Sequence, residues 1–78
     1  YSLVMPGAVI KRGAKVKYSI IAENAVIGED AAIGEDPAVY GSDNWGITVI
    51  GDKIKIGKKA IIKPDRMITK DVAEEEVL

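Results

Sequence analysis

The chain has 78 residues, of which 47% are hydrophobic and 29% are charged. This is the size of one small domain and the composition of an ordinary folded one, which argues against a disordered tail. The formal charge of −1 gives no electrostatic reason to expect nucleic acid or an anionic membrane as partner. The chain contains neither His nor Cys. Imidazole bases, cysteine nucleophiles, disulfides and zinc sites of the Cys or His type are therefore excluded.

β-branched aliphatic residues recur at six-residue intervals along nearly the whole chain. A period of six drifts around an α-helix of 3.6 residues per turn, so helices do not fit the pattern. We expect these side chains to point inward, with one bend in every six residues. The recurring residues form three runs: Val4, Ile10 and Val16; Ile21, Ile27, Ile33 and Val39; Ile50, Ile56, Ile62 and Ile68.

A polar or turn-forming pair follows the inward positions, and the next residue is usually small. The second member of the pair is often Gly, Asn or Asp, the residues that adopt positive φ at the lowest cost. A bend after each short strand closes a triangle of three strands, and successive triangles stack through parallel ladders. The pairs are Pro6-Gly7, Arg12-Gly13, Glu23-Asn24, Glu29-Asp30, Glu35-Asp36 and Pro64-Asp65.

The pattern resembles the hexapeptide repeat of single-stranded, left-handed parallel β-helices. The match is closest in residues 21–38, which read IAENAV-IGEDAA-IGEDPA, and in residues 56–61, which read IGKKAI. The resemblance covers residues 4–68 and implies an all-β fold of about three coils. The left-handed sense comes from the resemblance, because the period alone does not give it and other parallel crossovers are right-handed.

Three segments depart from the repeat. Residues 16–20 form a five-residue unit, which predicts a tighter corner. Residues 40–49 interrupt the count and predict a protruding loop. Residues 69–78 leave the pattern and predict an irregular tail. We interpret residues 1–78 as one hexapeptide-repeat domain cut from a longer protein.

The order of three motifs resembles the C-terminal β-helix of bacterial glucose-1-phosphate adenylyltransferases (ADP-glucose pyrophosphorylases) or their paralogous subunits. These motifs are SLVMPG at residues 2–7, YSIIAENAVIG at 18–28 and WGITVIG at 45–51. The resemblance implies that a parent nucleotidyltransferase makes ADP-glucose from ATP and glucose 1-phosphate for glycogen or starch synthesis. Catalysis and Mg²⁺ binding are then expected in an N-terminal domain, and no catalytic, cofactor or metal residue is expected in this segment.

The same resemblance assigns the segment to assembly and allosteric control. It implies packing on the catalytic domain, a homo- or heterotetramer and a phosphorylated metabolite as effector. It also implies a cytoplasmic location, which fits the lack of a targeting signal or a long apolar run. Many family members place a phosphate-binding Lys at the position of Asp52. Either Lys53 takes this contact by a one-residue shift, or the protein responds weakly or not at all to effectors.

Other interpretations remain open at this point. The late lysines at positions 53, 55, 58, 59 and 63 could receive a phosphate-bearing ligand or form a solvated face. The acidic pairs 29–30 and 35–36 should face water. The chain could also belong to a hexapeptide acyltransferase whose His lies outside the segment, or serve only as an oligomerisation module. Eight further apolar residues should point outward or flank corners, and several of them could form a stripe that docks a neighbour: Met5, Val9, Tyr18, Val26, Tyr40, Trp45, Ile47 and Ile61. Alternatively, Tyr40 and Trp45 only fold the loop back over the end of the coil.

Overall fold

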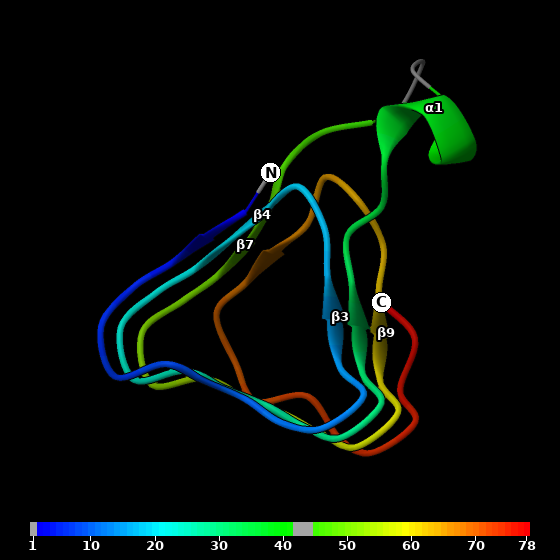
Figure 1. Ribbon diagram of the computed structural model, residues 1–78. Helices are drawn as coiled ribbons and strands as arrows, with labels where there is room; N and C mark the ends of the chain where they lie inside the picture. Colours follow the sequence, from blue (N-terminus) through cyan, green and yellow to red (C-terminus); the bar gives the residue numbers. More distant parts are fainter. Residues whose placement is uncertain (1, 42–44) are drawn as a thin grey trace.

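A computed structural model describes residues 2–41 and 45–78. The structure is nearly all-β, with parallel strands in three sheets and one short helix. Consecutive strands enter the three sheets in turn, an arrangement compatible with a β-helix, and Figure 1 shows the resulting triangular outline. The elements are β1 (Leu3–Val4), β2 (Val9–Ile10), β3 (Lys15–Val16), β4 (Ser19–Ile21), β5 (Val26–Ile27), β6 (Ala32–Ile33), α1 (Pro37–Tyr40), β7 (Thr48–Ile50), β8 (Lys55–Ile56), β9 (Ile61–Ile62) and β10 (Met67–Ile68).

We name the sheets by their strand order. Sheet A is β1-β4-β7-β10, sheet B is β2-β5-β8 and sheet C is β3-β6-β9. We use the word level for three consecutive strands, one from each sheet, so that β1–β3 are the first level. The fourth level consists of β10 and the tail residues that bridge to β8 and β9. In every sheet each inward position pairs with an inward position of the next level, as Ile27 does with Ile56. Equivalent residues of the repeat therefore lie next to each other in successive levels.

Most of the predicted inward residues form the core. Ile21, Ile27, Ile33 and Ile50 are fully buried, and Ile56, Ile62 and Ile68 are nearly so. Burying a side chain of this size contributes about 1.5–3 kcal/mol. The small residues Ala25, Ala31 and Ala60 lie in the same core. The predicted inward register is confirmed for the levels that have a neighbour on both sides.

The first level differs because the described residues place nothing above it. Val4 and Ile10 keep 46% and 38% of their surface exposed, although they pair with Ile21 and Ile27 in the expected register. Their exposure therefore comes from their place at the end of the stack and not from a change of register.

The bends follow the predicted backbone chemistry. Positive φ occurs at the second member of five of the predicted pairs, and also at Tyr18 in the five-residue unit. Asp36 is the exception, because its φ of −67° makes it the N-cap of α1. The bend residues with positive φ are Gly7, Gly13, Tyr18, Asn24, Asp30, Lys53, Lys59, Asp65 and Glu75.

The insertion begins earlier in the chain than predicted. Pro37 opens α1, and the carboxylate of Asp36 accepts a hydrogen bond from the Ala38 N–H at 2.7 Å. Val39, predicted to point inward, lies on this helix and is 73% exposed, so that prediction is wrong. The predicted loop of residues 40–49 is also too late, because Thr48 and Val49 already belong to β7. Residues 42–44 of that loop lie outside the described part of the chain.

The tail continues the ladders instead of leaving them. Val72 forms a parallel bridge with Ile56, and Val77 forms one with Ile61. Val72 is buried, and Glu75 adopts the positive φ of the other bends. Ile68 and Val72 are only four residues apart, so the six-residue count misses the continuation.

Candidate functional site

Lys53, the predicted phosphate contact, lies at the bend between β7 and β8. Its side chain is exposed, its φ is +59°, and its N–H donates to the Glu23 carbonyl at 3.0 Å. The exposed Asp52 precedes it. The structure thus gives Lys53 a backbone role at a corner and leaves its ammonium group accessible. The predicted effector contact stays a prediction.

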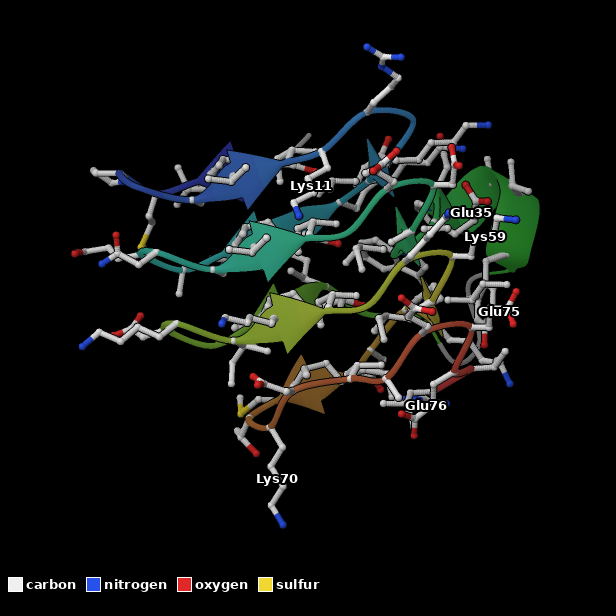
Figure 2. The ribbon with its side chains drawn as sticks, turned by 90° about the horizontal axis from the view of Figure 1, so that it is seen from below. Lys11, Glu35, Lys59, Lys70, Glu75 and Glu76 are labelled. Atoms are coloured by element: carbon white, nitrogen blue, oxygen red, sulfur yellow. The ribbon has the colours of Figure 1, made fainter. Side chains whose placement is uncertain are left out.

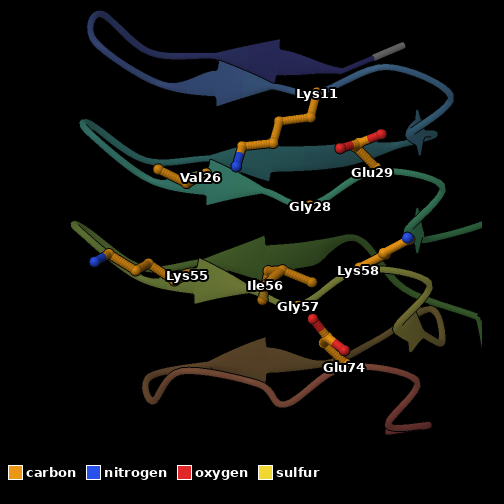
Figure 3. A pocket seen from close by; sticks show the side chains of 9 residues that line it. All are labelled: Lys11, Val26, Gly28, Glu29, Lys55, Ile56, Gly57, Lys58 and Glu74. Atoms are coloured by element: carbon orange, nitrogen blue, oxygen red, sulfur yellow. The ribbon is translucent and has the colours of Figure 1, made fainter.

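The late lysines are distributed over several corners and strands. A surface cavity of about 290 Å³ brings Lys55 and Lys58 together with Lys11. Figure 3 shows the side chains of Lys55 and Lys58 directed to opposite sides of this cavity. Glu29 and Glu74 also line it, and Lys53 does not. The cavity therefore has mixed charge and no set of converging cations.

The two acidic pairs have different surroundings. Glu29 and Asp30 are exposed at a bend. Glu35 accepts hydrogen bonds through Oε1 from the Asp36 N–H at 2.8 Å and from the Lys17 ammonium at 3.1 Å. The bond from the Asp36 backbone, and then the one from Lys17, lower the pKa of Glu35. Within residues 2–41 and 45–78, no group of three or more acidic side chains could hold a metal ion.

The segment between β6 and β7 is held against the stack by contacts near both of its ends. The indole N–H of Trp45 donates to the Glu35 carbonyl at 2.6 Å. The rings of Trp45 and Tyr18 meet edge to face, 5.6 Å apart, and the Tyr18 hydroxyl donates to Asp36 at 3.4 Å. Trp45 therefore folds back against the coil, as one of the two sequence interpretations expects. Tyr40, on α1, remains exposed.

The outward face of sheet A differs from those of the other two sheets. In each of its strands the residue before the inward one is apolar, and these four residues align across the sheet. Leu3 and Met67 are 54% and 72% exposed, whereas Ile20 and Val49 are half-buried. With their outward neighbours along the strands they form what we call the apolar face. It consists of the residues directly before and after the inward residue of each strand, namely Leu3, Met5, Ile20, Ala22, Val49, Gly51, Met67 and Thr69.

No charged residue belongs to the apolar face, although 29% of the chain is charged. The corresponding outward positions of sheet B include Lys11, Lys55 and Asp71, and those of sheet C include Lys15 and Lys63. Loss of charge together with exposed apolar side chains is typical of a surface that packs on another protein. Of these residues, only Met5 was predicted from the sequence to point outward and dock a neighbour. The signal was present, since an apolar residue precedes the inward residue in each strand of sheet A.

Comparison with protein-family models, with curated proteins and with solved structures gives no match to this chain. In the described residues, no helix has the length and apolar character needed to cross a membrane.

Proposed function

We propose that this chain is the C-terminal assembly and allosteric-regulatory domain of a glucose-1-phosphate adenylyltransferase or of its paralogous subunit. The proposal includes a left-handed sense for the β-helix and about three coils. The apolar face carries it, because an uncharged sheet face with exposed apolar side chains such as Leu3 and Met67 is typical of a surface that packs on another protein. The order of the three sequence motifs supports the choice of family.

In this proposal the parent enzyme makes ADP-glucose in its N-terminal domain with Mg²⁺, in the cytoplasm. The apolar face packs on a neighbouring part of the tetramer, either the catalytic domain or another subunit. The absence of charge there matters, since burying an unpaired charge costs several kcal/mol whereas burying Leu3 or Met67 is favourable. Charged groups such as Lys53 and Lys58 lie at the corners, which stay free for a phosphorylated effector.

The assembly role is tested by placing a charge on the apolar face of the complete protein. Met67→Glu should weaken oligomer assembly by about tenfold or more, because the carboxylate would be desolvated without a partner. Sedimentation velocity over a range of concentrations measures the change. Ile61→Glu is the matched control, since Ile61 is an exposed, outward apolar residue on sheet C. Equal assembly of the Met67→Glu variant and the wild type would remove the apolar face from the proposal.

The regulatory role is tested at Lys53. Lys53→Ala should raise the effector concentration for half-maximal response by about tenfold, the value of one charge-assisted hydrogen bond. Activity without effector should stay unchanged. Lys59→Ala is the matched control, because Lys59 is also an exposed bend residue with positive φ. If both variants respond to phosphorylated metabolites like the wild type, Lys53 has no effector role.

A further inference from the structure

Both methionines of the chain lie on the apolar face. The sequence contains two methionines and no cysteine. Met5 directly follows the inward Val4 of β1, and Met67 directly precedes the inward Ile68 of β10. The thioether of methionine is oxidised to a sulfoxide, which turns an apolar side chain into a polar one. The sulfur chemistry of this chain is therefore confined to the surface that we propose for packing.

Met67 is the more exposed of the two methionines. Its side chain lies on the fourth level, and 72% of its surface is exposed, compared with 54% for Leu3 on the same face. Met5 is half-buried. An oxidant must reach the sulfur atom to react with it, so Met67 is expected to be oxidised before Met5.

A sulfoxide on Met67 would stand on a surface with few hydrogen-bond donors. The apolar face contains no charged residue, and Thr69 carries its only polar side chain. Lys70 follows directly, and Figure 2 shows its side chain directed away from the levels above it. Water would hydrate the sulfoxide oxygen on the free chain, but packing against an apolar partner would remove that water without replacing its hydrogen bonds. Oxidation therefore makes the burial of Met67 unfavourable.

We propose that Met67 is a modification site, and that its oxidation by hydrogen peroxide prevents the apolar face from packing on a partner. The Met67 sulfur attacks one oxygen of the peroxide, so that an S–O bond forms and the O–O bond breaks. The sulfur gives up an electron pair to the peroxide, whose other oxygen leaves as water. The products are the sulfoxide and water. The inference rests on the proposed function, since it requires the apolar face to be an assembly surface.

Oxidation and assembly oppose each other at this residue. A partner that packs on the apolar face covers the Met67 sulfur and slows its reaction with peroxide. Conversely, a chain that already carries the sulfoxide packs weakly. The modification therefore acts on chains that have not yet assembled and keeps them unassembled until the sulfoxide is reduced, a reaction that methionine sulfoxide reductases catalyse.

The experiment treats the complete protein with dilute hydrogen peroxide and locates the added oxygen by mass spectrometry of its peptides. Met67 should gain the oxygen faster than Met5. In sedimentation velocity over a range of concentrations, the Met67 sulfoxide should raise the dissociation constant of assembly by about tenfold or more. Reduction by methionine sulfoxide reductases, one for each epimer, should restore assembly.

Two leucine variants assign the effect to one sulfur atom. Leucine keeps the apolar character and nearly the volume of methionine but cannot form a sulfoxide. After the same peroxide treatment, Met67→Leu should assemble like the untreated wild type. Met5→Leu is the matched control and should lose assembly as the treated wild type does.

Several results would overturn the inference. They are a Met67 that stays unoxidised, a Met67 sulfoxide that assembles like the untreated chain, and an equal loss of assembly in the treated Met67→Leu variant. Loss of the fold on oxidation, seen by far-ultraviolet circular dichroism, would also contradict it. The Met67→Glu variant separates this inference from the proposed function. If Met67→Glu weakens assembly and the sulfoxide does not, only the inference fails, and if neither changes assembly, both fail.

Discussion

Replacing Ile27 by aspartate is expected to unfold the protein or to lower its free energy of unfolding by about 4 kcal/mol or more. Ile27 is fully buried and pairs with inward residues on both sides, Ile10 and Ile56. The substitution removes a large apolar side chain, which costs about 2–5 kcal/mol, and adds a buried carboxyl group without a partner. The total stability of a chain this size is about 4–12 kcal/mol, so most of it would be lost.

Thermal and urea unfolding measure this effect against Ile61→Asp. Ile61 is also a strand isoleucine, but it points outward and is 46% exposed. Its replacement should change the free energy of unfolding by about 1 kcal/mol or less, as at most surface positions. If the two variants melt at the same temperature, the inward and outward assignment of the strands is wrong.

Gly28→Ala is expected to cost about 3 kcal/mol, although it adds a single methyl group. A Cβ atom on Gly28 would lie 2.7 Å from the backbone of Ile56, Gly57 and Lys58. Backbone atoms cannot move aside as a flexible side chain can, so the two levels must separate locally. The separation strains the 2.8 Å hydrogen bond from the Gly28 N–H to the Ile56 carbonyl.

Gly51→Ala provides the matched comparison for this variant in urea unfolding. Gly51 also follows an inward isoleucine, but its Cβ would approach the Ile68 carbonyl only to 3.2 Å. A small adjustment relieves that contact. Alanine also raises the free energy of unfolding by about 0.4–1 kcal/mol, because it reduces the entropy of the unfolded chain. Gly51→Ala should therefore be nearly neutral. Equal losses in the two variants would mean that the close approach at Gly28 does not limit the stack.

The sequence alone predicts the core of this fold well, for a physical reason. Stacked levels present the same environment every six residues, so buried side chains recur along the chain with a simple six-residue period. Ile21, Ile27 and Ile33 follow it without exception. The bends can be predicted where the residue with positive φ is Gly, Asn or Asp, as at Gly7 and Asn24, but not where it is another residue, as at Lys53, Lys59 and Glu75.

The predictions of inward residues are wrong where the six-residue spacing no longer coincides with the burial of the side chains. Val39 keeps the spacing, but Asp36 and Pro37 start a helix before it, and the Asp-Pro pair is a recognisable helix start. Val72 breaks the spacing yet is buried, because the bend between Ile68 and Val72 uses fewer residues than the others. A count along the chain cannot detect a shorter bend that leaves the ladder intact.

The candidate site was harder to predict from the sequence than the core. The apolar face depends on which strands share a sheet, since Leu3, Ile20, Val49 and Met67 are far apart in the chain. In contrast, the position of Lys53 at a bend follows from the repeat, but its ligand does not follow from its position.

The layered pairing also determines how the molecule comes apart. Each level contacts only the levels directly above and below it, so its local stability is nearly a sum of two interfaces. The levels at the two ends have one such interface each. In the 78-residue chain by itself, opening therefore proceeds inward from both ends, and the amide protons of Val26, Ile27 and Ala32, in the second level, exchange with solvent later than those of Leu3 or Val77.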